Sequence, residues 1–254
     1  MNESEIIAGF IKGVSDSVAE KIGEAPAKTF NSLWDITFGG VDSYAEKIAY
    51  KRALDVQSFK NSLEDKIMDI PENNVQEPEI SLLGPALEST KYYISDESLR
   101  ELFINLIAKS MDDRYNNKTH HAFVEIIKQM SPTDAEFFRH IGVSERVVSA
   151  KIIKIYENGS QSDVTDHFIQ AYGYDRALIQ LTINNLKRLG LIELDTLSPA
   201  HPESLYDTFY EDEYFKELEL ESQVTYFDKF TVDIVKSRIS ITSLGKAMFA
   251  VCVV

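Results

Sequence analysis

Residues 78–141 constrain the fold more than any other part of the chain, because helix start and stop signals recur through them at short intervals. Proline has a fixed φ and lacks an N–H, so it suits the first position of a helix better than the interior. The sequence therefore predicts that Pro85 opens a helix that ends near Tyr93. Signals spaced this closely are expected to build a multi-helix region with short connections.

A second helix is predicted behind Ser95. The serine can accept a backbone N–H as an N-cap, and the following Asp96 and Glu97 favour the positive end of the helix. The apolar residues behind this cap recur with the 3.6-residue period of a single helix face, as a core-facing helix requires. They are Leu99, Leu102, Phe103, Leu106, Ile107 and Met111.

Two further helices are predicted after the second. Thr119 is the expected cap of the first of these. Its apolar face consists of Phe123, Ile126, Ile127 and Met130. Ser131 and Asp134, with a proline between them, then resemble a capping box, in which a serine and an acid each bind the other's backbone N–H. Phe138 and Ile141 continue the apolar face of the helix that starts there.

Three pieces of this region resemble a bacterial family described as abortive infection alpha. The matching pieces are Pro85–Leu87, Leu99–Ala108 and His121–Pro132, and the likeness extends more weakly toward the C-terminus. These motifs are patterns of helix packing. The resemblance implies a role in bacterial defence against phage, and it brings no catalytic residues with it.

Composition indicates which classes of partner the protein can bind and in which cellular compartment it is expected. The chain has 254 residues, a net charge of −15 and a single cysteine, Cys252. General affinity for nucleic acid comes from Lys and Arg that neutralise phosphates, so this charge argues against a general nucleic-acid binder but leaves room for a local basic patch. A lone cysteine fits the reducing cytoplasm. The acidic first residues lack the basic region of a secretory signal, and no apolar stretch approaches the ~20 residues that span a bilayer. We therefore expect a cytoplasmic protein.

Residues 29–41 carry a single charge and contain the only tryptophan of the chain. Phe30, Trp34 and Phe38 recur every four residues, so they lie on one face of a helix. The interpretation that we favour makes them core or subunit-interface residues. The alternative is a membrane-disturbing effector that inserts residues 1–45 into a bilayer, although helices on membrane surfaces usually carry many Lys and Arg residues on their polar face.

The pattern changes after Ile141, where β-branched residues and turn signals indicate strands. The predicted elements are a strand at 148–156, a short helix at 162–172, a longer helix from Asp175 to Leu189, strands at 191–194 and 237–242, and a last helix from Thr242 or Ser243. Asp175 is the expected cap of the longer helix, and Gly190 is its expected stop. The apolar face of that helix is Leu178, Ile179, Ile183, Leu186 and Leu189. This order resembles a winged helix-turn-helix.

In a helix-turn-helix the second helix enters the major groove of DNA. Here that helix begins at Asp175, and Arg176, Lys187 and Arg188 are the residues that a DNA-binding regulator would use. Residues 203–221, between the two predicted wing strands, hold eight acidic residues and one lysine. Such a charge repels phosphates, which makes nucleic acid the less favoured partner.

The acidic insertion, at about 197–230, also contains interleaved aromatic residues. Acids mixed with exposed aromatics suit a protein-binding surface or a nucleic-acid mimic better than a nucleic-acid reader. The plainer interpretation is a solvated loop whose aromatic side chains fold back onto the core. The candidate partner-binding residues are Tyr206, Phe209, Tyr210, Tyr214 and Phe215.

No set of residues has the spacing of an active site. His120 and His121 are adjacent, so on a helix they point about 100° apart and cannot hold one metal ion from one face. The sequence has no glycine-rich phosphate loop followed by lysine and no nucleophile-elbow pattern. We therefore expect no catalytic residues, no metal and no cofactor.

The predicted fold is mainly α, with an N-terminal helical region at 1–74, a central helical region at 75–142 and a C-terminal winged helix-turn-helix-like α+β module at 143–254. The predicted function is anti-phage defence through protein–protein recognition without catalysis. A phage or host protein is the expected partner, and a homo-oligomer is a further expected state. The alternatives are the membrane-disturbing effector, with a membrane contact through the N-terminus, and the winged-helix DNA-binding regulator.

Overall fold

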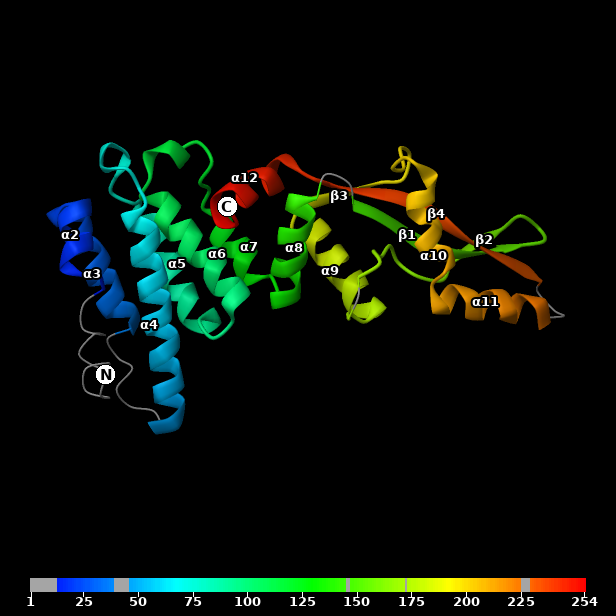
Figure 1. The fold of residues 1–254 in the computed structure, drawn as a ribbon, viewed down its shortest axis with the longest axis horizontal. Helices are drawn as coiled ribbons and strands as arrows, with labels where there is room; N and C mark the ends of the chain where they lie inside the picture. Colours follow the sequence, from blue (N-terminus) through cyan, green and yellow to red (C-terminus); the bar gives the residue numbers. More distant parts are fainter. Residues whose placement is uncertain (1–12, 39–45, 145–146, 172, 225–228) are drawn as a thin grey trace. The chain divides into compact units, whose positions relative to one another are not determined.

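The computed structural model describes residues 13–38, 46–144, 147–171, 173–224 and 229–254, with the backbone alone at 46–52 (Figure 1). These residues divide into two units. Unit 1 comprises the described residues up to Ala135 together with Ala247–Val254, and unit 2 comprises those from Glu136 to Lys246. The protein is mostly helical, and a four-stranded antiparallel sheet lies in the C-terminal half of the chain.

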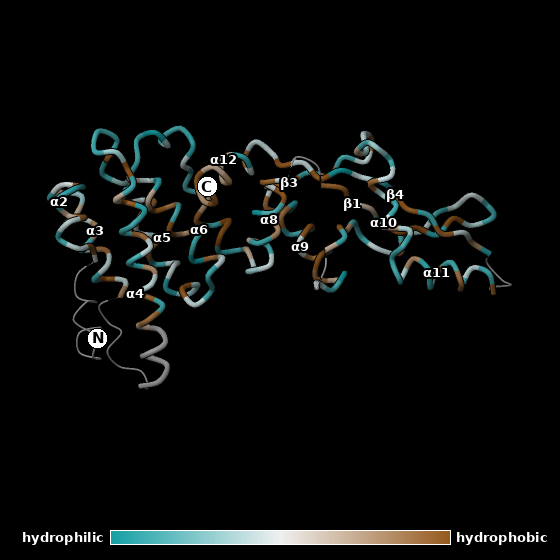
Figure 2. The backbone as a smooth tube through the Cα atoms, viewed as in Figure 1, coloured by the Kyte–Doolittle hydropathy of each residue, from teal (hydrophilic) through white to brown (hydrophobic). Residues whose placement is uncertain are grey.

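Unit 1 is helical and is organised around one central helix. Its elements are α2 (Asp16–Ile22), α3 (Glu24–Phe38), α4 (Glu46–Met68), α5 (Ile80–Tyr93), α6 (Glu97–Ser110), α7 (Ala122–Lys128) and the first turn of α8 (Pro132–Val143). Helix α6 packs against α4, α5 and α7. Figure 2 shows the alternation of hydrophobic and hydrophilic residues along these helices.

Helix α6 is buried on nearly all sides. The apolar face predicted at 99–111 is buried throughout, which confirms the prediction, and Ile104, Asn105 and Ala108 on its other sides are buried as well. The predicted cap was wrong by one residue. Asp96 is the N-cap and its Oδ1 accepts a hydrogen bond from Leu99 N at 2.9 Å. Ser95 instead donates through Oγ to Asp55 Oδ2 at 2.7 Å.

The prediction that Pro85 opens a helix was also wrong. Helix α5 begins at Ile80, and Pro85 lies inside it. A proline inside a helix removes one backbone hydrogen bond and crowds the preceding turn. Leu82 and Leu83 before it are 3% and 0% exposed and Ala86 and Leu87 after it are 0% exposed, so the helix has apolar packing on both sides of the proline. That packing offsets the missing hydrogen bond.

The start of α8 is the capping box that the sequence predicted. Asp134 N donates to Ser131 Oγ at 3.1 Å, and Ser131 N donates to Asp134 Oδ2 at 2.7 Å. The apolar face predicted for 123–130 is buried, as are Phe138 and Ile141. Thr119 does not cap α7. It donates instead to Tyr115 O at 3.0 Å, because the chain makes a further turn before the helix begins.

The last residues of the chain complete unit 1. Helix α12 (Ser243–Cys252) begins in unit 2, where Thr242 Oγ1 accepts from Gly245 N at 2.9 Å as one of its two predicted caps. Further along the helix, Met248, Val251 and Cys252 are fully buried in unit 1. Asn105 of α6 donates through Nδ2 to Cys252 O at 2.8 Å.

Unit 2 is built on an antiparallel sheet with the order β2-β1-β4-β3. Its elements are β1 (Val147–Tyr156), β2 (Gln161–Asp163), α9 (Arg176–Arg188), β3 (Ile192–Asp195), η3 (Glu203–Tyr206), α10 (Asp207–Tyr210), α11 (Glu213–Val224) and β4 (Phe230–Ile241). Strands β1 and β4 pair along their length, from Val147 opposite Ile239 to Tyr156 opposite Phe230. The predicted pairing of the 191–194 and 237–242 strands is confirmed by the β3–β4 ladder.

The helix predicted at 162–172 is not formed. The described residues of this segment contain strand β2 and a bridge between Phe168 and Ala150, whose backbone groups exchange two hydrogen bonds of 2.9 and 3.0 Å. Contact with β1 has therefore outweighed a local helical pattern. The segment does not supply the first helix of the predicted helix-turn-helix.

Helix α9 follows the prediction at both of its ends. Asp175 is the N-cap, accepting from Ala177 N at 3.1 Å, and Gly190 follows the helix with a φ of 73°, which favours glycine. Its inner face is buried. Leu178, which the sequence assigned to that inner face, is instead 37% exposed.

Candidate functional site

Residues 203–221, here called the acidic segment, fold into η3, α10 and the first part of α11. Three of the five candidate partner-binding aromatics point inward: Tyr206, Phe209 and Phe215 are 0%, 0% and 2% exposed. Tyr210 and Tyr214 are half-buried. The aromatics therefore fold back onto unit 2, as the plainer interpretation had it, and carboxylates cover the outside of the segment.

Tyr206 anchors the beginning of the acidic segment to the sheet. Its hydroxyl donates to Ser237 O on β4 at 2.7 Å and accepts from Ala200 N at 3.0 Å. The ring of Phe209 then packs edge-on against Phe168 with the ring centroids 5.3 Å apart. A buried hydroxyl with both of its hydrogen bonds made holds a segment more specifically than apolar contact alone.

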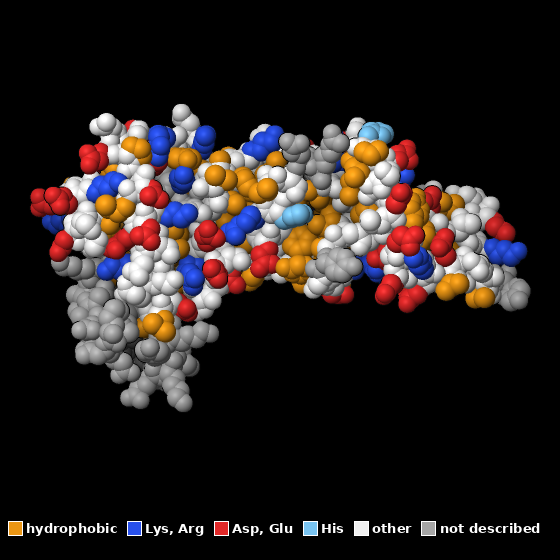
Figure 3. All heavy atoms as spheres, in the orientation of Figure 1, with side chains coloured by type: hydrophobic (Ala, Val, Ile, Leu, Met, Phe, Trp, Pro, Cys, Tyr) orange, Lys and Arg blue, Asp and Glu red, His pale blue; other side chains and the backbone are white. Residues whose placement is uncertain are grey.

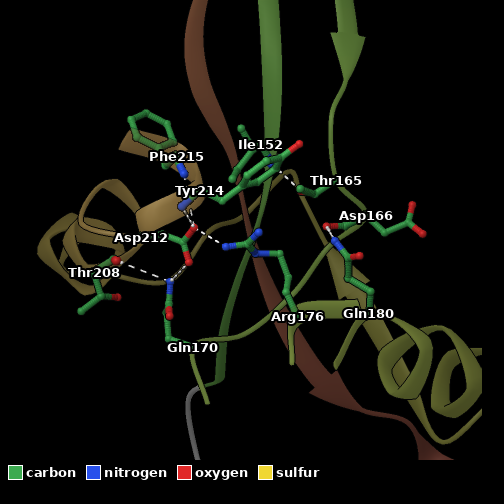
Figure 4. A network of polar contacts seen from close by, with 10 residues as sticks. All are labelled: Ile152, Thr165, Asp166, Gln170, Arg176, Gln180, Thr208, Asp212, Tyr214 and Phe215. Atoms are coloured by element: carbon green, nitrogen blue, oxygen red, sulfur yellow. Dashed lines mark hydrogen bonds and ion pairs between the residues drawn. The ribbon is translucent and has the colours of Figure 1, made fainter. Parts of the chain in front are cut away.

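Arg176, at the first turn of α9, joins that helix to the acidic segment (Figure 4). Its guanidinium pairs with Asp212 and lies over two rings, with Cζ 5.2 Å from the centroid of Phe168 and 4.8 Å from that of Tyr214. A planar guanidinium can bind a carboxylate and stack on aromatic faces at the same time. Gln170 adds a weaker contact to Asp212 at 3.4 Å.

Asp212 also caps α11. Its Oδ1 accepts from Tyr214 N at 3.1 Å and from Phe215 N at 3.3 Å. Burial raises the pKa of this carboxyl, but the hydrogen bond and charge of Arg176 outweigh burial, so the pKa lies below its ordinary value of 3.8. Asp212 is therefore a structural carboxylate that starts α11 and ties it to α9.

Lysines of the sheet form ion pairs with the edges of the acidic segment. Lys236 Nζ lies 3.0 Å from Glu203 Oε2, and Lys154 Nζ lies 3.3 Å from Glu221 Oε1. The hydrogen bond and charge of Lys236 lower the pKa of Glu203. Pairs this close to solvent contribute little free energy, so we regard them as orienting contacts. Carboxylates remain exposed at Asp207, Glu213, Glu217 and Glu219.

The aromatic residues predicted as core or membrane contacts lie in the interior of unit 1. Phe30, Trp34 and Phe38 are 0%, 0% and 3% exposed, so in this chain they are core residues. Trp34 lies 4.5 Å from Phe38 and 6.0 Å from Phe59 of α4, measured between ring centroids. Of the 1–45 region that the membrane alternative needs, residues 1–12 and 39–45 lie outside the described residues.

The family model of abortive infection alpha matches residues 51–252, which is most of the chain. The chain belongs to the abortive infection alpha family. This membership points to an anti-phage role in abortive infection. The match covers α5 to α8, which contain the matching motifs, and also the sheet and the acidic segment of unit 2.

Comparison with other proteins adds little to the family match. A solved structure described as an uncharacterized protein from the hydrocarbon-degrading marine bacterium Alcanivorax borkumensis SK2 is similar to 55% of this chain and 94% of its own. The two are 16% identical, with a TM-score of 0.33. None of the curated proteins compared with the chain matches it.

The residues considered for DNA contact lie at opposite ends of α9 in this abortive infection alpha protein. Lys187 and Arg188 are exposed near the end of α9. Arg176 is at the opposite end, committed to Asp212 and two rings.

Within the described residues, no group of three or more His, Cys, Asp or Glu side chains could hold a metal ion. None of the helices in the described ranges is long and apolar enough to cross a bilayer. Burial raises the pKa of the Cys252 thiol far above its ordinary value, so this thiol is held in its unreactive form.

Sequence reasoning missed Asp212, Phe168 and Gln170 as parts of the site. One local signal was present for Asp212, since an aspartate directly before a helical segment is a common N-cap. Its pairing with Arg176 spans 36 positions and has no local signature. Phe168 was assigned to the helix that does not form.

Proposed function

We propose that this member of the abortive infection alpha family acts without catalysis, by recognising a phage or host protein through the outer surface of the acidic segment. The contact then releases growth arrest of the infected cell. The observation that carries the proposal is how the acidic segment is attached to unit 2: its buried aromatic side chains anchor it, and its carboxylates face the solvent.

A surface segment that is ordered in this way suits recognition of a protein. Anchoring by Tyr206, Phe209 and Arg176 orders the segment before any partner arrives, so little ordering entropy is lost on binding. A surface of one charge steers an oppositely charged partner and discriminates against others. The expected partner is therefore a protein with a basic surface, and the same carboxylates repel nucleic-acid phosphates.

The test is phage plating on a bacterial host that expresses the intact chain or a variant. Replacing both Glu217 and Glu219 by glutamine removes two exposed charges and leaves the buried anchors in place. We expect protection to weaken by about tenfold or more, since close opposite charges across an interface contribute strongly to binding. The matched control replaces the exposed Glu157 and Glu193, which lie outside the segment, by glutamine.

Equal protection by the wild-type chain, the control and the Glu217→Gln/Glu219→Gln variant would contradict the role of the acidic segment. An absence of protection by the wild-type chain against a broad phage panel would instead count against an anti-phage role in that host. Circular dichroism of each purified variant establishes that it is folded before it is scored.

A further inference from the structure

Helix α9 carries apolar residues on two faces. The inner face contains Ile179, Ile183 and Leu186, which are 3%, 0% and 0% exposed. On the outer face, Leu178 is 37% exposed and Leu181 is 65% exposed. A surface helix normally has one apolar stripe, and a second, solvent-facing one marks a contact surface. Figure 3 shows hydrophobic side chains gathered at the surface over α9.

The outer face of α9 ends in a positive charge. Arg188 lies two helical turns beyond Leu181, about 10 Å along the axis, and on nearly the same side of the helix. Its guanidinium is exposed, and it donates to Asn185 Oδ1 of the same helix at 2.8 and 3.1 Å, which orients it along this face. The outer face therefore runs from apolar at its N-terminal end to basic at its C-terminal end.

Helix α11 has an outer face with the opposite order and the opposite charge. Phe215 and Leu218 are buried beneath the helix, whereas Leu220 and Val224 are 63% and 70% exposed. Glu213, also exposed, lies two turns before Leu220 on the same side. This face has Glu213 at its N-terminal end and Leu220 and Val224 at its C-terminal end; Lys216, on the same side between them, pairs with Glu211. Figure 3 shows acidic side chains followed by hydrophobic ones along α11.

The two outer faces match when the helices run antiparallel. With Leu181 opposite Leu220, the two-turn spacing in each helix brings Arg188 opposite Glu213, and Val224 falls beside Leu178. A parallel arrangement in the same register places Glu213 beyond the start of α9, at the end of the helix opposite to Arg188. The charges therefore select one orientation as well as one partner surface.

We propose that α9 of one copy of this chain packs antiparallel against α11 of a second copy, with Leu181 on Leu220 and Arg188 paired with Glu213. A second copy is the occupant because both halves of the complementary pair are present on one chain with matched spacing. Within a single copy the two faces are both exposed, so they do not satisfy each other. This inference goes beyond the proposed anti-phage function and does not depend on it.

Each copy offers one α9 face and one α11 face. Two copies can therefore make the contact twice and close a two-fold dimer, or make it once and leave a face free for a third copy. Sedimentation velocity of the purified full-length chain over the micromolar range distinguishes these states by mass. Both states satisfy the proposal.

Charge reversal provides the decisive measurement. We expect Arg188→Glu and Glu213→Arg each to weaken self-association by about tenfold or more, because each brings like charges together. An equimolar mixture of the two variants should associate again, since every α9–α11 contact between the unlike chains then restores an Arg–Glu pair. Leu220→Glu should abolish association.

Matched controls reverse charges next to the proposed contact. Lys187→Glu lies on α9 one residue from Arg188 but turned away from the outer face, and Glu219→Arg lies likewise on α11. Both controls should associate like the wild-type chain. Loss of association by the controls to the same degree, or failure of the mixture to recover, overturns the proposal. A wild-type chain that stays monomeric throughout the range also overturns it and assigns the two faces to foreign partners.

Discussion

Helices α6 and α9 begin from similar sequence patterns and end in different surroundings. Both carry apolar residues at helical spacing behind an aspartate cap. Helix α6 is enclosed by α4, α5, α7 and the end of α12, so its residues are buried on nearly every side. Helix α9 buries only its inner face and leaves Leu178 and Leu181 exposed. The difference teaches that apolar periodicity in the sequence indicates which residues tend to be buried. Which of them are buried depends on the elements that pack against the helix.

The largest expected effect tests the enclosed helix. Leu106 is 0% exposed, so Leu106→Ala should lower the free energy of unfolding of unit 1 by about 3 kcal/mol through lost burial and a residual cavity. Urea unfolding followed by the fluorescence of Trp34, the only tryptophan, reports on this unit. A cost below about 1 kcal/mol would show that α6 is less enclosed than the structure indicates.

The next effect tests how α9 is held at its first turn. Arg176→Met keeps much of the side-chain volume but leaves the carboxylate of Asp212, which is 12% exposed, without its cation. We expect unit 2 to lose about 2 kcal/mol, the cost of an uncompensated buried charge and a lost charged hydrogen bond. Hydrogen exchange of the α11 amides measures the loss. Unchanged protection there would mean that Arg176 does not join the two elements.

A smaller effect concerns the polar residue inside the enclosed helix. Asn105→Ala removes the donor to Cys252 O and should cost unit 1 about 1–2 kcal/mol. The same change should speed the reaction of the Cys252 thiol with an alkylating reagent, because the last turn of α12 is held less tightly. A variant whose thiol reacts as slowly as that of the wild-type chain would show that apolar packing alone closes this end of unit 1.

The pH dependence of stability tests the Arg176–Asp212 pair that holds the start of α9. The pKa of Asp212 is lowered in the folded state, so its contribution to stability is present above its ordinary value of 3.8 and is lost as the pH falls through the lowered pKa. The free energy of unfolding of unit 2 should therefore fall more steeply below pH 3.8 in the wild-type chain than in Asp212→Asn. If the free energy of unfolding fell equally steeply with pH in both proteins, Asp212 would not contribute to the loss of stability in acid.

The smallest expected effect concerns the exposed face of α9. Leu181 is 65% exposed, so Leu181→Ala should change the free energy of unfolding of the monomer by less than about 0.5 kcal/mol. Urea unfolding at a concentration where the chain is monomeric provides the measurement. A cost comparable to that of Leu106→Ala would erase the contrast between the two helices.

Elements whose signals are local could be predicted from the sequence. The capping box of Ser131 and Asp134, the apolar face of α6 and both ends of α9 were predicted because a few neighbouring residues determine each of them. The β3–β4 pairing was also predicted, since β-branched runs with suitable turns indicate strands.

The failures share a long-range cause. The helix predicted at 162–172 does not form, because the backbone of Phe168 pairs with that of Ala150 on β1 and this segment joins the sheet. Pro85 lies inside a helix because packing of Leu82 and Leu83 begins that helix earlier. In the candidate site, Arg176 and Asp212 are 36 positions apart, so no window of sequence contains both. The aromatic residues were found by composition, but their burial depended on where the sheet lies.

The docking of Ala247–Val254 into unit 1 has a consequence for biosynthesis. Domains generally fold in the order in which they leave the ribosome. Here every residue of unit 2 is made before the residues that cover Asn105 in unit 1. The unit that is started first is therefore finished last. If the ribosome stalls just before Ala247, all residues of unit 2 have been synthesised. Unit 1 still lacks the residues that cover Asn105.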